Sequence, residues 1–251
     1  MDPSPPTLLF GHRAWRQCLQ AACFVLLSAI TVLAQTVRPV IDENIVQGPG
    51  KKAKGKIEYV NDSLQPLTVT LDTQSFTVSD TGELSYRPLD SNIHVKFSAT
   101  SFRIPPRQSY LVFYEATADA VPSWFVVYAT FAGYKERTAE GLKIQLLLPH
   151  TIYLLPKEQV KKDELVIKTA EYDPGSKIVR VRVENTGDVF CRVLEADLTA
   201  GQDKATNNGF PVFPHSQRQV EIPWPAKNGP TRLTLQLQQF QLQREIGSTM
   251  P

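Results

Sequence analysis

The sequence is poor in the residues from which exported domains build disulfides. It contains three cysteines, and two of them, Cys18 and Cys23, lie in an apolar N-terminal segment that has the pattern of an export signal. Cys191 is therefore alone in the chain that remains once this segment is removed. A lone cysteine in an apolar strand pattern is usually a small buried hydrophobe, so we expect Cys191 to be packed and the protein to be held together without disulfides.

Signatures of catalysis and of metal binding are also scarce. The four histidines are His12, His94, His150 and His215, and no two of them have the spacing of a zinc-binding helix. No Gly-x-Ser-x-Gly nucleophile motif occurs, and the carboxylates are spread singly along the chain. The sequence therefore predicts a protein that is not an enzyme and that needs no metal and no cofactor.

The sequence also lacks an excess of charge of either sign. The formal net charge is +2, and the lysines and arginines are scattered, which argues against a nucleic-acid partner. The stretch "GPGKKAKGKIEYVN", residues 48–61, has the glycine and lysine spacing of a phosphate-binding loop, but Ile57 stands where that loop needs Ser or Thr, and a strand pattern follows instead of a helix. We expect no nucleotide site, and we interpret the glycines and lysines as a solvated connection between strands whose lysines guard a sheet edge.

The first 34 residues resemble a secretory signal. Arg13 and Arg16 precede an apolar run from Leu19 to Leu33, and small residues at the end of this run indicate cleavage after Ala34. The run is on the short side for a membrane span, and an uncleaved anchor is the alternative. The sequence thus predicts an exported protein with a signal peptide over residues 1–34.

No segment shows a convincing helical stripe, whereas alternation with period two is frequent. It places Ile57 with Tyr59, Leu67 with Val69 and Leu71, and Leu111 with Phe113 on common faces. Short strands separated by Asn, Asp, Gly and Pro predict an all-β protein built from β-sandwiches.

Two long apolar strands stand out from the others. "WFVVYATF", residues 124–131, is apolar on both faces and is expected at the centre of a sheet. "LKIQLLL" then sets four aliphatic side chains on one face, and Pro149 and Pro156, which cannot donate ladder hydrogen bonds, favour an edge position for this strand. These four side chains either fill the core of their own sandwich or are offered to a partner strand; they are Leu142, Ile144, Leu146 and Leu148.

A polar, highly charged stretch, "PKEQVKKDE", marks the expected domain boundary. We predict an N-terminal domain over residues 35–157 and a C-terminal domain over residues 158–247, both all-β. The two halves share turn chemistry, since Asn61 and Asn185 each follow a strand and precede a short turn, where their side chains are expected to bond the backbone.

The order of segments resembles the periplasmic pilus-assembly chaperones, or PapD-like family. The matching pieces include "KGKIEYVND", "SFRIPPRQSYLVFYEA", "PSWFVVYATF", "GLKIQLLLPHTIYLLPK" and "VFPHSQRQVEIPWP", and the resemblance covers about residues 38–245. It implies two immunoglobulin-like β-sandwich domains, a periplasmic location and a role in pilus, or fimbrial, assembly in the cell envelope. The implied partners are an incomplete pilus subunit and an outer-membrane usher.

The resemblance also implies a site. In that family an edge strand supplies the subunit's missing strand without ATP, and the corresponding donor residues here are Leu142, Ile144, Leu146 and Leu148. The family holds the subunit's terminal carboxylate with an arginine on the first strand and a lysine late on the donor strand. The lysine position falls near Thr151, beside His150, and the arginine position falls near Asn44 or Ile45, which makes Arg38 a loose candidate.

Two other classes of function remain open. One is a structural or adhesive cell-envelope protein whose sandwiches act as spacers and keep all their leucines buried. The other is a carbohydrate-binding module, which would need aromatic side chains gathered on one face, whereas Trp124 and Trp224 are isolated.

Overall fold

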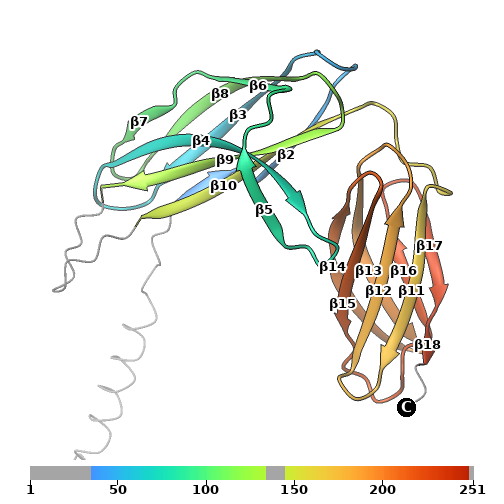
Figure 1. Cartoon of the computed structure of the whole chain (residues 1–251). Coiled ribbons are helices and arrows are strands. Elements are labelled where there is room, and N and C mark those ends of the chain that lie inside the picture. Colours follow the sequence, from blue (N-terminus) through green and yellow to red (C-terminus); the bar gives the residue numbers. More distant parts are fainter. Residues whose placement is uncertain (1–34, 134–144, 249–251) are drawn as a thin grey trace, which may run out of the picture. The chain divides into compact units, whose positions relative to one another are not determined.

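The structure is a computed structural model that describes residues 35–133 and 145–248 (Figure 1). Within these ranges all regular secondary structure is β-strand, which confirms the all-β prediction for the described residues. The predicted signal peptide, residues 1–34, lies outside them. In the same ranges no helix is long and apolar enough to cross a membrane.

The strands of the first sandwich come from residues 36–155. They are β1 (Thr36–Arg38), β2 (Ile41–Ile45), β3 (Ala53–Asn61), β4 (Leu67–Val78), β5 (Leu84–Pro88), β6 (Ile93–Phe97), β7 (Ser101–Ile104), β8 (Gln108–Ala118), β9 (Ser123–Ala132) and β10 (Leu146–Leu155). One sheet has the order β1-β3-β8-β6, and the other has the order β2-β10-β9-β4-β5, with β7 also paired to β4.

The two sheets of this sandwich share a single core. Alternate side chains of β3, β4, β8 and β9 point into it, among them the fully buried Ile57, Leu67 and Phe125. Strand β9 lies between β10 and β4, and its other face is covered as well, because Val126 belongs to a second apolar cluster. The central position predicted for residues 124–131 is confirmed.

The chain changes sheets directly after its first short strand. β1 pairs antiparallel with β3, the Arg38–Pro39 peptide is cis, and β2 then pairs parallel with β10 in the other sheet. Because β2 is only five residues long, it covers only part of its neighbour. The point at which the chain crosses to the second sheet, and the shortness of β2, therefore set how much of the β10 edge is left without a neighbouring strand.

The second sandwich is built from residues 165–248. Its strands are β11 (Leu165–Asp173), β12 (Ile178–Asn185), β13 (Cys191–Ala200), β14 (Asp203–Val212), β15 (Ser216–Pro223), β16 (Arg232–Gln236), β17 (Gln241–Glu245) and β18 (Gly247–Ser248), arranged in sheets β15-β12-β11-β18 and β14-β13-β16-β17. Cys191 is 2% exposed in this core, and burial raises the pKa of its thiol to about 12, so it is packed as expected. β10 ends and β11 begins on either side of the predicted boundary, while the domain limits 35–157 and 158–247 stay predictions.

The two turn asparagines behave alike and as expected. Asn61 and Asn185 are both fully buried, and each side-chain amide donates to the backbone carbonyl four residues on, at 2.8 Å in both turns. Each side-chain oxygen accepts from the backbone N–H two residues on, at 3.0 Å in both. These bonds satisfy the buried amide and close the turn, so the shared turn chemistry is confirmed.

Part of the interpretation of the stretch 48–61 was wrong. β3 starts at Ala53, so Lys54, Gly55 and Lys56 lie within a strand and not in a connection between strands. Alternation accounts for the difference, because the same stretch buries Ala53 and Ile57 on one face and exposes the lysines on the other. No helix follows, and a phosphate-binding loop is therefore absent from these residues.

Candidate functional site

The candidate site is the first half of β10, the strand that closes the first sandwich (Figure 1). β10 pairs antiparallel with β9 from Leu146 to Leu154, whereas β2 pairs with it only from Thr151 to Leu155. Among the described residues, Leu146–His150 therefore have a neighbouring strand on one side only. We call this segment the open half of β10 and Thr151–Leu155 the closed half.

The hydrogen bonds of the closed half show which backbone groups of the open half point away from β9. The N–H of Thr151 donates to Val40 O at 2.9 Å, and the C=O of Leu155 accepts from Val46 N at 2.8 Å, so both groups point away from β9. Backbone direction alternates along a strand, which places the N–H and C=O of Leu147 and the C=O of Pro149 at the open edge. Pro149 has no N–H to lose at this edge, which is why a proline is tolerated there.

Side chains of the open half divide between two environments. Leu146 and Leu148 are half-buried and pack against the core between the two sheets, whereas Leu147 is 52% exposed. Leu146 and Leu148, two members of the aliphatic row predicted from the sequence, therefore lie on the same face of β10 as its buried core residues Ile152 and Leu154. The other two members of this row, Leu142 and Ile144, lie outside the described residues, and the role of all four stays a prediction.

His150 marks the end of the open half. Its side chain is fully buried, and Nδ1–H donates to the carbonyl of Pro39 at 2.5 Å, next to the point where the chain changes sheets. Burial lowers the pKa of His150, while this bond and the carboxylate of Asp42 oppose the shift. Nε2 is buried and has no partner among the described residues. The imidazole is therefore neutral at pH 7 and ties β10 to the start of β2.

A buried tyrosine ties β2 to the opposite sheet. The hydroxyl of Tyr114, on β8, donates to Asp42 Oδ2 at 2.5 Å and accepts from Asn44 Nδ2 at 2.9 Å. Burial is the main cause that raises the pKa of this tyrosine, followed by the bond to Asp42. Its ring passes over Gly55, where a Cβ atom would lie 2.4 Å from two ring carbons and from the hydroxyl oxygen. Gly55 thus makes room for a tyrosine and not for a phosphate.

The three anchor candidates from the sequence do not gather at one point. Arg38 is exposed on β1, on the side of its sheet that faces away from the core. His150 points into the core, and Thr151, as the next residue of the strand, points to the opposite face of β10. A carboxylate anchor made from these residues stays a prediction.

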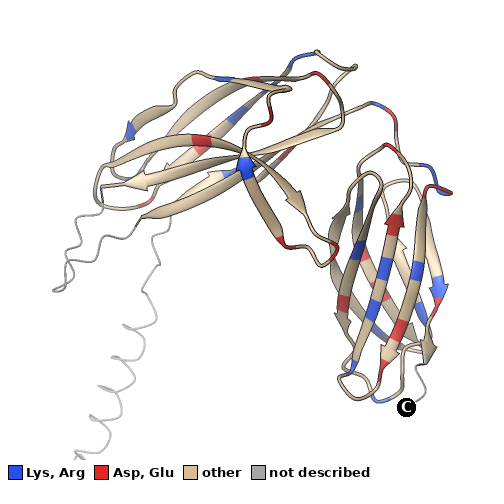
Figure 2. Cartoon of the chain, in the orientation of Figure 1, with Lys and Arg blue, Asp and Glu red and all other residues tan. Residues whose placement is uncertain are grey.

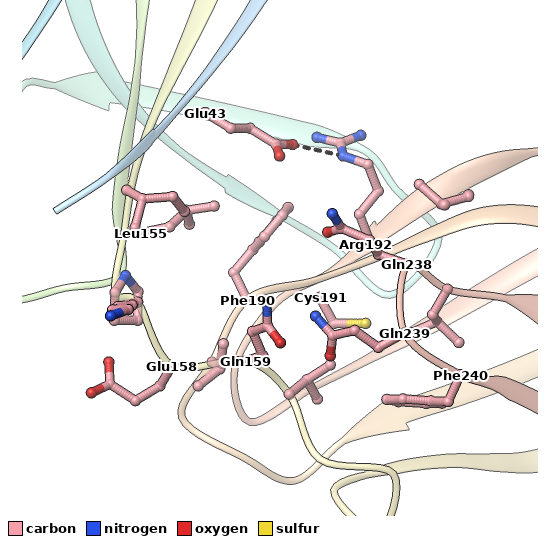
Figure 3. A pocket seen from close by; sticks show the side chains of 17 residues that line it. Glu43, Leu155, Glu158, Gln159, Phe190, Cys191, Arg192, Gln238, Gln239 and Phe240 are labelled. Carbon is pink, nitrogen blue, oxygen red and sulfur yellow. Dashed lines mark hydrogen bonds and ion pairs between the residues drawn. The ribbon is translucent and has the colours of Figure 1, made fainter.

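Sequence reasoning missed an arginine close to β2 (Figure 3). Arg192, on β13, donates through Nε to Glu43 Oε1 at 2.8 Å, and its guanidinium lies 5.8 Å from the ring centre of Tyr153 and 5.6 Å from that of Phe190. Its Nη2 is buried without a partner among the described residues. A cavity of about 300 Å³ lies beside this pair, lined by residues that include Leu155, Glu158, Gln239 and Phe240. The only sequence signal was a charged residue within an apolar strand.

The described residues hold no group of three or more His, Cys, Asp or Glu side chains that could bind a metal ion. The prediction that the protein is not an enzyme stays a prediction.

Comparison with known proteins gives matches in structure alone. No family model matches the sequence, and no curated protein matches it. A chain in the solved structure of the Salmonella enterica SafA pilin in complex with the SafB chaperone matches with a TM-score of 0.53 and 12% identity, over 86% of this chain and 98% of that one.

Two further solved structures match at a similar level. A chain of a chaperone–tip adhesin complex of CFA/I fimbriae biogenesis has a TM-score of 0.51 and 12% identity, over 85% of this chain and 98% of that one. The class 5 fimbriae chaperone CfaA has a TM-score of 0.50 and 13% identity, over 85% and 99%. The predicted likeness to this family is confirmed at the level of the fold, which is that of two immunoglobulin-like β-sandwiches.

Proposed function

We propose that this chain is an exported, ATP-independent, chaperone-like protein that binds an incomplete partner protein by strand addition along the open half of β10. One observation carries the proposal: within the described residues, Leu146–His150 have a neighbouring strand on one side only. An uncovered apolar edge of this kind is an aggregation hazard unless a partner pairs with it. Strand addition uses such an edge, because backbone bonds supply affinity and alternate side chains supply specificity.

The open half offers the two kinds of group that strand addition needs. The backbone groups of Leu147 and the carbonyl of Pro149 can bond an incoming strand. Leu146 and Leu148 already border an apolar core and would extend into the core that the partner lacks. Leu142 and Ile144 are proposed to continue the same row upstream.

The proposed partner is a subunit of the pilin type, and the proposed location is the periplasm, reached through the signal at residues 1–34. The structural neighbours include a chaperone–pilin complex and a chaperone–tip adhesin complex, which supports a protein partner of this class. Delivery to an outer-membrane usher belongs to the same proposal.

A proline scan of β10 tests the proposal. Leu147→Pro removes the N–H that faces the open edge and leaves the bonds to β9 intact, whereas Leu147→Ala keeps the N–H and removes the same exposed side chain. We expect copurification of envelope partners with the exported protein to be lost in Leu147→Pro and retained in Leu147→Ala. Equal retention in both variants would contradict strand addition.

Leu148→Pro is the control for folding. Its N–H faces β9, so this proline breaks the internal ladder, and the thermal unfolding temperature should fall well below that of Leu147→Pro. If Leu147→Pro unfolds as readily as Leu148→Pro, the edge is not free in the native protein and the proposal fails.

One observation favours a second candidate, a structural or adhesive envelope protein. Leu146 and Leu148 contact the core of their own sandwich, as expected if all the leucines serve that core. The double variant Ile144→Glu, Leu146→Glu separates the two candidates. A folded variant that loses its partner supports the chaperone-like function, and a variant that fails to fold supports the spacer.

A further inference from the structure

The outward face of the β1-β3-β8-β6 sheet carries an exposed apolar pair at its centre. Leu111 is 46% exposed and Phe113 is 57% exposed, although the neighbouring Val112 and Tyr114 are buried. The sequence alternation placed the pair on one face of β8, and the structure shows that this face points away from the core. Two large apolar side chains, two residues apart on an inner strand, are left uncovered by the described residues.

Cationic side chains surround this pair; Figure 2 colours Lys and Arg blue along the ribbon. The register places Lys56 beside Phe113, Glu58 beside Leu111, and Lys54 and Lys96 on either side of Glu115. Five cations lie on or border this face, against the two carboxylates Glu58 and Glu115, and they are Arg38, Lys52, Lys54, Lys56 and Lys96. The whole chain has a formal net charge of only +2, so positive charge is concentrated on this face.

One of the two carboxylates on this face, Glu115, is already paired with lysines. Glu115 accepts from Lys52 at 3.1 Å and from Lys54 at 2.8 Å, and these bonds hold the pKa of its carboxyl group below the ordinary value. Lys56 and Lys96 are exposed, and neither forms an ion pair with a carboxylate of the described residues. A hollow of about 420 Å³ lies between Lys54 and Lys96 and is bordered by Phe113.

We propose that this face binds the surface of an anionic phospholipid bilayer. Phe113 and Leu111 would enter the interfacial layer, and the surrounding lysines would pair with lipid phosphates, which is how a peripheral protein combines apolar insertion with charge attraction. An exposed pair on an open sheet face, with cations on both flanks, suits a fluid anionic surface better than a peptide, which would need a groove or a free strand edge.

The proposal is independent of strand addition. The face belongs to β3, β8 and β6, whereas the open half of β10 is in the other sheet. A partner on β10 and a bilayer on β8 would therefore use different sheets. Failure of one proposal leaves the other standing.

Vesicle sedimentation tests the binding with the exported protein and no partner. We expect more protein to sediment with vesicles of phosphatidylcholine and phosphatidylglycerol in equal parts than with phosphatidylcholine alone. The difference should vanish in about 1 M salt, where the Debye length is about 3 Å. Equal binding to both kinds of vesicle, or none to either, would overturn the proposal.

Matched lysine variants locate the surface. Lys54→Gln, Lys56→Gln, Lys96→Gln should weaken partition to anionic vesicles about 100-fold, since each lysine near such a surface contributes about fivefold. The control changes net charge equally on exposed lysines of the second sandwich and of the segment just before it, Lys162→Gln, Lys177→Gln, Lys227→Gln, and should retain most of the binding. Residues 1–34, where present, are common to both variants. An equal loss in the two triples would show attraction by net charge alone and overturn the proposal.

The apolar pair has its own variant. Phe113→Ser removes an exposed side chain, so the thermal unfolding temperature should not change, while partition to anionic vesicles should fall about tenfold. Unchanged partition would overturn the proposed insertion.

Discussion

The two halves of β10 differ although they belong to one strand and pair with the same neighbour. Both bond to β9, but only the closed half, Thr151–Leu155, also bonds to β2. The length of uncovered edge is therefore set by where β2 begins, and not by the sequence of β10 itself. Pro39 and the groups that hold β2 in place are thus part of the candidate site, even though they are not on β10.

β2 is held mainly by polar contacts. Its apolar side chains Ile41 and Ile45 are 43% and 64% exposed, so it buries little apolar surface of its own. Asp42 and Asn44 bond to Tyr114, and Glu43 bonds to Arg192. Hydrogen bonds of this kind contribute about 1 kcal/mol each. A strand held in this way can be loosened by single substitutions, which makes the comparison of the two halves testable.

Matched leucine truncations should show the largest difference between the halves. Leu154, in the closed half, is fully buried, and Leu154→Ala should lower the free energy of unfolding by about 3 kcal/mol because it leaves a cavity. Leu147, in the open half, is 52% exposed, and Leu147→Ala should cost less than about 0.5 kcal/mol. Chemical denaturation measures both, and similar losses would mean that the two halves are equally enclosed.

Gly55→Ala should have the next largest effect. The new Cβ would lie 2.4 Å from the ring of Tyr114, which would have to move away from Asp42 and Asn44. We expect a loss of about 2 kcal/mol in the free energy of unfolding, as is typical of overpacking.

The double variant Gly55→Ala, Tyr114→Ala is the control for this clash. In the background Tyr114→Ala, the substitution at Gly55 should cost almost nothing, because no ring remains in its way. If Gly55→Ala costs the same in both backgrounds, the ring is not the reason for the glycine.

Tyr114→Phe should have a smaller effect that is confined to β2. It keeps the ring and removes the hydroxyl that joins Asp42 and Asn44, at a cost of about 1 kcal/mol. Amide hydrogen exchange should become faster in β2 and at Thr151 of the closed half, so that the open edge lengthens, while β9 keeps its protection. Uniformly faster exchange over the whole sandwich would contradict a local role.

The fold was largely readable from the sequence because alternation and turn chemistry are local signals. The doubly apolar stretch 124–131 lies at the centre of a sheet, and the turn bonds of Asn61 and Asn185 are formed as expected. Alternation does not say which face is the core, however. The alternation placed Leu111 and Phe113 on one face of β8, and only the packing of the two sheets shows that this face points away from the core.

The features that define the candidate site depend on contacts between distant residues. The end of the open half depends on a five-residue strand that changes sheets at Pro39. The need for Gly55 depends on a ring from β8, and Glu43 meets an arginine 149 residues away. No pattern within a short window carries this information. The apolar alternation of β10 could therefore be predicted from the sequence, whereas the length of edge that is left free could not.

Protonation of His150 in acid should destabilise β10 where its open and closed halves meet, and this destabilisation should be absent at neutral pH. Burial lowers the pKa of His150 in the folded protein, so below the ordinary histidine value of about 6.5 the unfolded chain binds a proton that the folded chain does not. The stabilising effect of a neutral His150 is thus fully present above about pH 6.5 and is lost as the pH falls toward the folded-state pKa. His150→Asn keeps a donor for the carbonyl of Pro39 and cannot titrate. Between about pH 7.5 and about pH 5, the unfolding temperature of the wild type should fall more than that of this variant, and equal falls would show that His150 does not gate the closed half.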